Sequence, residues 1–123
     1  MQKITGIGGV FFKARDPQAL MAWYTEHLGL EFAHGTAVFD WNNPEPPASP
    51  GSTAFSFFKA ESTYFQPSEK PFMINFRVSD LVALLQELKA KGVTVVGEME
   101  EHEYGKFGWI VDPEGNKIEL WQP

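Results

Sequence analysis

The sequence predicts an α+β fold in which two βαβββ modules form one curved mixed sheet with a concave cleft. An internal repeat and matching strand–helix signals in each half predict it: Phe12 aligns with Phe76 at an offset of 64 residues. A single module covers only one face of its strands with a helix, so pairing two modules leaves a shared concave face. Module one is expected at about 4–59 and module two at about 71–122, within a single domain of residues 1–123.

Each half contains one helix with clear start and stop signals. Asp16 and Asp80 are the expected N-caps, because an aspartate side chain accepts from the free backbone N–H groups of a first turn. Pro17 occupies the first helical position, where its missing N–H costs nothing. Gly29 and Gly92 are expected to end the two helices in the left-handed conformation.

Strands are expected to fill most of the remaining chain. Segment 111–116 predicts a hairpin with Pro113 in a type I turn and Gly115 in the left-handed position that follows. Four prolines make residues 42–51 a surface loop, interpreted either as a plain connector or as a lid over the cleft. The expected strands are 4–14, 30–34, 36–42 and 53–59 in module one, and 71–78, 93–99, 106–112 and 116–122 in module two.

Composition argues against several classes of function. The net charge is −6 and the ten lysines and arginines are scattered, whereas a nucleic-acid binder needs a basic stripe. Cysteine is absent, which excludes disulfides and thiolate metal sites. The N-terminal residues do not have the pattern of a signal peptide, and no apolar run approaches the length of a membrane span. We therefore expect a soluble cytoplasmic protein without nucleic-acid or membrane partners.

Two stretches of sequence carry a resemblance to a known superfamily. The first runs from Phe12 to Asp16 and on to Trp23, Tyr24 and residues 28–30, and the second covers residues 109–121. Together with the duplicated βαβββ pattern, they resemble the vicinal-oxygen-chelate superfamily of glyoxalase, bleomycin-resistance and extradiol-dioxygenase proteins. The resemblance spans nearly the whole chain and implies the glyoxalase/bleomycin-resistance/dioxygenase fold, a small-molecule ligand and a homodimer. It also implies that an enzyme with this sequence is a lyase or isomerase related to lactoylglutathione lyase.

The same resemblance sets an expectation about metal. In metal-using members, two His and two Glu on the concave face hold a divalent ion. Carried over, the two His positions are Gly9 and Met73, and the first Glu falls within residues 55–58, which contain no carboxylate. Only Glu119 matches, and one carboxylate does not make a metal site. We therefore expect no divalent metal and no other cofactor.

Strand alternation selects candidate residues for the cleft, on the face opposite the apolar side chains that point toward the helices. A mostly aromatic lining with a few polar groups is typical of a ligand site and favours a planar or aromatic ligand. The alternative is that these rings pack on one another and close the cleft. The candidate ligand-binding residues are Phe11, Phe55, Phe57, Met73, Asn75, Trp109 and Trp121, with His102 and Tyr104 in an acidic loop at the mouth.

Three functions remain open, of which a metal enzyme with unorthodox ligands ranks last. The first is a metal-free binding protein, like the bleomycin-resistance branch, which sequesters planar cationic molecules; the acidic chain and the aromatic lining fit it. The second is a lyase or isomerase that acts on a small carbonyl compound with Glu119 as the catalytic base, because an apolar site makes a carboxylate a better base. Glu119 is otherwise expected to be a salt-bridge partner of Lys13 or Arg77, or a structural relic without a catalytic role. The sequence does not name the ligand and leaves open whether the protein is an enzyme.

Overall fold

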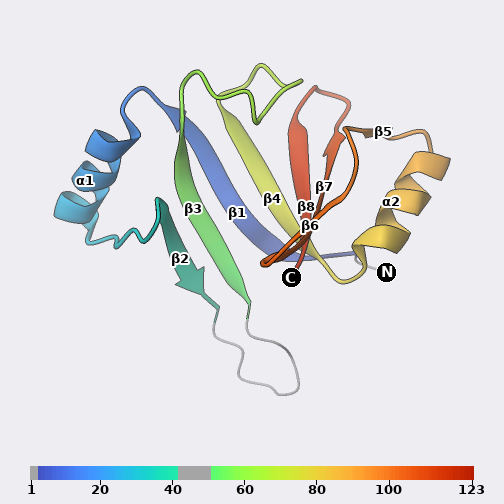
Figure 1. The fold of residues 1–123 in the computed structure, drawn as a ribbon, viewed down its shortest axis with the longest axis horizontal. Coiled ribbons are helices and arrows are strands. Elements are labelled where there is room, and N and C mark those ends of the chain that lie inside the picture. Colours follow the sequence, from blue (N-terminus) through green and yellow to red (C-terminus); the bar gives the residue numbers. More distant parts are fainter. Residues whose placement is uncertain (1–2, 42–50) are drawn as a thin grey trace.

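The computed structural model describes residues 3–41 and 51–123, and it contains a strand followed by a capped helix in each half (Figure 1). Of the predicted loop at 42–51, only Gly51 lies among the described residues. In chain order the elements are β1 (Ile4–Ala14), α1 (Pro17–Leu28), β2 (Thr36–Asp40), β3 (Ser52–Lys59), β4 (Phe72–Val78), α2 (Leu81–Ala90), β5 (Thr94–Val95), β6 (Glu100–His102), β7 (Gly105–Val111) and β8 (Lys117–Gln122).

Within the described residues, the strands form one eight-stranded sheet. Its order is β2-β3-β1-β4-β8-β7-β5, and β6 pairs with β7 outside this path. The antiparallel pair β1 and β4 joins the two modules in the middle of the sheet. On either side of it, β3 runs parallel to β1 and β8 runs parallel to β4. Both halves are therefore arranged in the same way, and the α+β fold class predicted from the repeat is confirmed.

The helix signals in the sequence are confirmed in both modules. Asp16 and Asp80 each accept a hydrogen bond at Oδ1 from the backbone N–H three residues later, at 3.1 Å in both cases. Gly29 follows α1 with a φ of 72°, and Gly92 follows α2 with a φ of 82°. These left-handed angles carry little strain for glycine, which has no Cβ, so each helix ends where the sequence predicts.

The strand predictions need three corrections. Residues 30–34 do not form a strand, because His34 and Gly35 have φ angles of 54° and 82° and make a tight turn that leaves only an isolated bridge between Ala33 and Thr36. Of the predicted strand at 93–99, only the two residues of β5 pair with β7. The acidic segment 100–102, which was predicted to be a loop, is strand β6.

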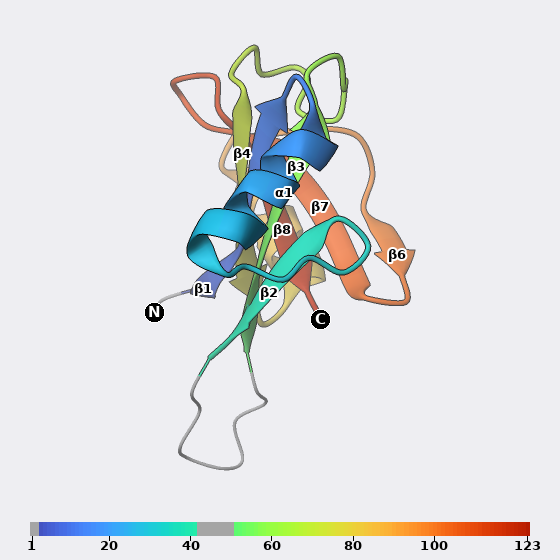
Figure 2. The same ribbon diagram turned by 90° about the vertical axis from the view of Figure 1, so that its left-hand side faces the viewer.

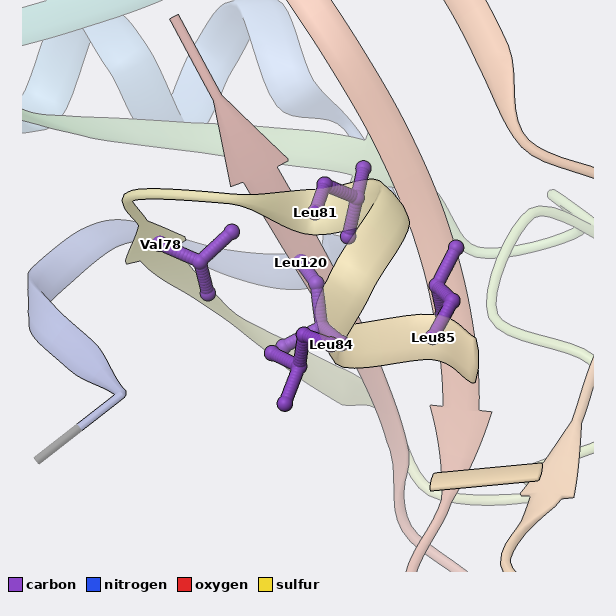
Figure 3. Close-up of a cluster of buried hydrophobic side chains, with 5 residues drawn as sticks. All are labelled: Val78, Leu81, Leu84, Leu85 and Leu120. Carbon is purple, nitrogen blue, oxygen red and sulfur yellow. The ribbon is translucent and has the colours of Figure 1, made fainter. Parts of the chain in front are cut away.

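The main hydrophobic core lies between α2 and the sheet (Figure 3). Leu81 is completely buried, and Leu84 and Leu85 extend the same apolar stripe of the helix. They pack on Val78 at the end of β4 and on Leu120 of β8. This packing fixes which face of β8 points to the helix, so its remaining residues must point to the opposite face.

Helix α1 covers the same side of the other half of the sheet, outside β1 and β3, but none of its residues is fully buried (Figure 2). Its Tyr24 contacts the β3 rings of Phe55 and Phe57, with ring centroids 5.8 and 5.2 Å apart. Across the described part of the chain, neither helix has the length and apolar character needed to cross a membrane.

Candidate functional site

The sheet face opposite the helices is the candidate cleft, and strand register determines which residues share it. Directly paired residues on neighbouring strands point to the same face. In module two, Asn75 of β4 pairs with Glu119 of β8, which pairs in turn with Trp109 of β7. In module one, Phe11 of β1 pairs with Ser56 of β3. The duplicated sheet therefore places Ser56 where module two carries Glu119.

Glu119 is the centre of a buried hydrogen-bond network on this face. Its Oε2 accepts from the Tyr64 hydroxyl at 2.5 Å and from the Trp109 indole N–H at 2.9 Å. Its Oε1 accepts from the Asn75 amide at 2.7 Å. The residue is only 3% exposed, so these donors replace the water that an isolated carboxylate would need. Three donors therefore converge on the two carboxylate oxygens, and both oxygens act as acceptors.

Tyr64 covers this carboxylate. Burial is the largest cause that raises the pKa of the Tyr64 phenol far above its ordinary value, and the nearby negative charge of Glu119 is the second. The phenol therefore stays neutral and acts as a donor. Lys117 lies beside it, with Nζ 5.0 Å from the Tyr64 ring centroid and 5.5 Å from the Trp109 ring centroid, and it donates to the Tyr64 carbonyl. Burial lowers the pKa of Lys117, while the charge of Glu119 acts in the opposite direction.

The connection between β3 and β4 brings Tyr64 to the cleft and fills part of it. This segment passes the strand ends at the top of Figure 1. Phe65 is completely buried and forms a cluster with Met73 and Trp109. Phe58 of β3 lies 5.0 Å from the Phe65 ring and 5.5 Å from the Tyr64 ring, centroid to centroid. The interpretation that rings pack together and close the cleft therefore holds for this part of the face.

A cavity of about 380 Å³ remains beside this cluster. Tyr64, Phe107 and Trp109 form its aromatic wall, and the β6–β7 hairpin contributes the polar side. His102 Nε2 lies 2.8 Å from Glu100 Oε1 within that hairpin. The full lining consists of Tyr64, Glu100, His102, Glu103, Tyr104, Phe107 and Trp109.

The structure brings most of the predicted site residues to this face, but only three of them into the cavity. Trp109, His102 and Tyr104 line it. Asn75 and Glu119 are joined to its Tyr64–Trp109 wall by hydrogen bonds. Three more predicted residues share this face but lie outside the cavity. Met73 and Phe11 pack around Phe65, and Trp121 stacks on Phe107 with ring centroids 6.0 Å apart.

The placement of Phe55 and Phe57 in the cleft is wrong. In the parallel register of β3 with β1, Phe57 pairs with Phe12, and the Phe55 ring lies 6.0 Å from Phe12. Both rings contact Tyr24 of α1, so they belong to the helix side of the sheet. The expected ion pair of Glu119 with Lys13 or Arg77 is also wrong: in the described part of the chain, neither cation lies within salt-bridge distance of Glu119.

Two groups of site residues were missed from the sequence. Tyr64 and Phe65 belong to the segment between the modules, which has no counterpart in the repeat and hence no predicted face. Glu100 and Glu103 lie in the acidic segment at the mouth but were not among the predicted site residues, and they line the cavity. The aromatic pair inside an otherwise polar connection was the one available signal for the first group.

The architecture described above is similar to that of known proteins. The family model described as a glyoxalase-like domain matches residues 9–121 of the chain. The chain belongs to this glyoxalase-like family. The resemblance to the vicinal-oxygen-chelate superfamily is thereby confirmed. No curated protein matches the sequence.

Several solved structures share the fold of this glyoxalase-like chain. Methylmalonyl-CoA epimerase from Mycobacterium tuberculosis is 22% identical with a TM-score of 0.63, and the match covers 100% of this chain and 91% of that one. A Streptomyces coelicolor methylmalonyl-CoA epimerase variant in complex with 2-nitronate-propionyl-CoA is 18% identical with a TM-score of 0.70, covering 97% of each chain. A Legionella pneumophila structure described as NAD-dependent benzaldehyde dehydrogenase is 15% identical with a TM-score of 0.60, covering 93% of this chain and 96% of that one. At these identities the similarity establishes the fold, and function has to be argued from the site.

The residues of this glyoxalase-like chain do not fit the divalent ion that the superfamily implies. Gly9 has no side chain, and Met73 is fully buried among aromatic rings. Ser56 stands where a carboxylate would be needed, and both oxygens of Glu119 already accept hydrogen bonds. Within residues 3–41 and 51–123, no three His, Asp or Glu side chains gather closely enough to hold a metal.

Proposed function

We propose that this glyoxalase-like chain is a small-molecule-binding protein whose cavity accepts a planar, positively charged organic molecule. The observation that carries the proposal is the composition of the cavity wall: the rings of Tyr64, Phe107 and Trp109, with the carboxylates of Glu100 and Glu103 beside them. Aromatic faces attract cations as well as planar rings, and the two acids add a favourable potential. The volume of about 380 Å³ suits a ligand with two or three fused rings.

A pair of matched probes tests this proposal. N-methylquinolinium and 1-methylnaphthalene have nearly the same two-ring shape, but only the first carries a charge. Titration followed by tryptophan fluorescence is expected to give tighter binding of the cation. Glu103→Gln is expected to weaken only the cation, by about two- to fivefold, as for an exposed charge pair.

Glu114→Gln is the control. This substitution removes the same charge, but Glu114 lies in the β7–β8 turn, away from the cavity. Equal affinity for the two probes, or equal weakening by both variants, would count against a cation site. If neither probe binds, the proposed pocket itself is refuted.

We also propose that binding needs no metal ion, since the donor set described above offers none of the usual ligands beyond Glu119. A ligand that binds only the native state raises the melting temperature. Mg²⁺, Mn²⁺, Co²⁺, Ni²⁺ and Zn²⁺ are therefore expected to leave the melting temperature unchanged at a few equivalents. A rise with one of them that saturates at one ion per chain would overturn this part.

The second candidate is a lyase or isomerase that acts on a small carbonyl compound with Glu119 as base. The 2.5 Å contact between the Tyr64 hydroxyl and the Glu119 carboxylate favours it, because a substrate that displaced Tyr64 would meet a preformed proton acceptor. Exchange of the α-hydrogen of hydroxyacetone in D₂O, followed by proton NMR, tests it. Catalysed exchange that Glu119→Gln reduces roughly 10²–10⁴-fold would favour the enzyme, whereas exchange at the rate of buffer alone favours binding.

A further inference from the structure

Arg77 of β4 lies next to two tryptophan rings that come from different modules. Its guanidinium carbon is 5.2 Å from the Trp41 ring centroid and 5.1 Å from the Trp121 ring centroid. Trp41 follows β2 of module one, and Trp121 lies in β8 of module two. At these distances the guanidinium is attracted to both ring faces.

Glycines on β1 and directly before β3 make room for this arrangement. A Cβ atom at Gly8 would lie only 2.9 Å from Trp121 Cε3 and 3.0 Å from Arg77 Cγ. A Cβ atom at Gly6 or Gly51 would collide with the Trp41 ring. Any larger residue at these positions would push the rings and the arginine stem away, so the backbone is shaped to hold them.

Both indoles are also fixed through their N–H groups. Trp41 Nε1 donates to Thr53 Oγ1 at 2.8 Å, and Trp121 Nε1 donates to the Tyr104 carbonyl at 2.8 Å. The rings therefore present a fixed environment to the guanidinium. An arginine whose position is set by its surroundings loses less side-chain entropy when its N–H groups bind an acceptor.

The charge of Arg77 is not matched within the described residues. The chain has sixteen acidic residues, yet none among 3–41 and 51–123 forms an ion pair with Arg77 or accepts a side-chain hydrogen bond from it. Partial burial lowers the pKa of Arg77. The five N–H donors of a guanidinium match carboxylate and phosphate oxygens.

We propose that Arg77, held by Trp41 and Trp121, is a subsite for the carboxylate or phosphate group of a small organic molecule. It adjoins the proposed cation pocket, because the Trp121 ring stacks on Phe107, which lines that pocket, with an interplanar angle of 6°. A molecule with its basic end in the pocket and its acidic end on Arg77 would have to span the Phe107 and Trp121 rings. The anion subsite itself does not depend on the proposed pocket, and only the shared ligand rests on the proposed function.

The test uses inorganic phosphate and a second pair of matched probes, 2-naphthoate and 2-naphthamide, on the whole chain. Resonances of the Trp41 and Trp121 indole N–H groups, recorded by ¹⁵N NMR, report on the subsite directly. Saturable shifts with phosphate are expected, together with at least tenfold tighter binding of naphthoate than of naphthamide. Arg77→Met keeps the apolar stem and is expected to abolish both effects, while Arg77→Lys retains part of the phosphate effect.

Arg15→Met is the control, because Arg15 is the only other arginine in the sequence and lies between β1 and α1, outside the cleft. It is expected to bind phosphate and naphthoate as the unmodified chain does. Equal affinity for the two naphthyl probes, no phosphate-dependent shift, or the same loss in Arg15→Met would overturn the subsite. Should Arg77→Met only unfold the chain, the comparison of naphthoate with naphthamide on the unmodified chain decides. Binding of N-methylquinolinium is measured separately. The experiment can therefore refute the anion subsite without refuting the cation pocket, and the reverse.

Discussion

At the scale of single residues, the main feature is a buried carboxylate whose two oxygens both accept hydrogen bonds from the protein. Glu119 lies beneath Tyr64 and Trp109, and Asn75 completes its set of donors. Asn75 donates through Nδ2, while its Oδ1 has no partner and faces Gly8. The amide orientation is thus set by the charge of Glu119 alone, which makes the pair sensitive to any change at position 119.

Glu119→Gln is expected to lower the free energy of unfolding by about 1–3 kcal/mol, the cost of leaving a buried donor unsatisfied. The new amide group offers one acceptor oxygen to donors that approached two, and turning Asn75 around only moves the unpaired donor elsewhere. Urea denaturation measures the change, and Glu61→Gln, at an exposed position, is the control. Equal stability of the two variants would mean that the network contributes nothing to the fold.

Tyr64 leads to a prediction about pH. Its raised folded-state pKa means that the stability it contributes is complete below the unfolded value of about 10 and is lost as the pH rises beyond that value. Between pH 9 and 11, the urea midpoint of the unmodified chain is therefore expected to fall more steeply than that of Tyr64→Phe. Absorbance at 295 nm is expected to show one fewer phenol ionising in the native chain than in the unfolded chain. Parallel pH profiles of the two proteins would contradict the assignment.

At the scale of elements, the two helices have equivalent caps but different anchoring. Both Asp16 and Asp80 cap a helix, yet α2 buries three leucines whereas α1 has no fully buried residue. An aspartate cap therefore begins both helices, although α2 is packed against the sheet more tightly than α1. Local stability of this kind is visible in hydrogen exchange.

Asp80→Ala is expected to lower the free energy of unfolding by about 1 kcal/mol, whereas Asp16→Ala is expected to lower it less and to increase amide exchange mainly within α1. Denaturation and hydrogen exchange measured on both variants test this difference. Asp80→Ser restores a capping oxygen and is expected to recover most of the loss. A larger global loss for Asp16→Ala would show that α1 is anchored as firmly as α2.

Element by element, the sequence predicted the faces of β1, β4 and β8 but not that of β3. In β4 and β8, polar Asn75 and Glu119 alternate with apolar neighbours, so one face is identified by its chemistry. In β3 the aromatic residues Phe55, Phe57 and Phe58 occupy both faces, and only Ser56 breaks the pattern. Reading Ser56 as the counterpart of Glu119 identifies the correct face, but that needs the strand register, which is a tertiary property.

The position of Tyr64 was not predictable for a related reason. The connection between β3 and β4 has no hydrophobic period and no equivalent in the other module, so nothing local indicates where it lies. Its course is set by long-range contacts, such as those of Phe65 with Phe58 and Met73. The repeat predicts the sheet, whereas the segment outside the repeat determines how much of the cleft stays open.

At the scale of the whole molecule, apolar surface is distributed unevenly. Leu28 and Val38 are 63% and 58% exposed, and Trp23 and Phe39 are also exposed. These residues belong to α1 and β2, which lie together on the side that faces the viewer in Figure 2. β2 is also an edge strand, with one side of its backbone free to pair within the described sheet. Exposed apolar patches next to a free edge favour association.

We therefore predict a homodimer formed through the α1–β2 side. Sedimentation velocity is expected to give twice the chain mass at micromolar concentration, and Trp23→Gln combined with Val38→Thr is expected to shift the protein toward the monomer. Tyr104→Ser, which removes an exposed ring from the cavity hairpin, is expected to leave the mass unchanged. A monomer mass at high concentration for the unmodified chain would refute the dimer.

Phe65 fills the part of the cleft next to Phe58. The residues in the two halves of the duplicated sheet are therefore expected to tolerate different substitutions. With one of these halves sealed by the chain's own side chain, Phe11 and Phe58 are constrained by fit alone and tolerate only substitutions of similar volume. The hairpin acids Glu100 and Glu103 line the cavity outside that cluster and are free to change with the molecule that is bound. Divergence among descendants of this chain is therefore expected to concentrate in the second copy of the repeat, while the first copy drifts only within the limits of its packing.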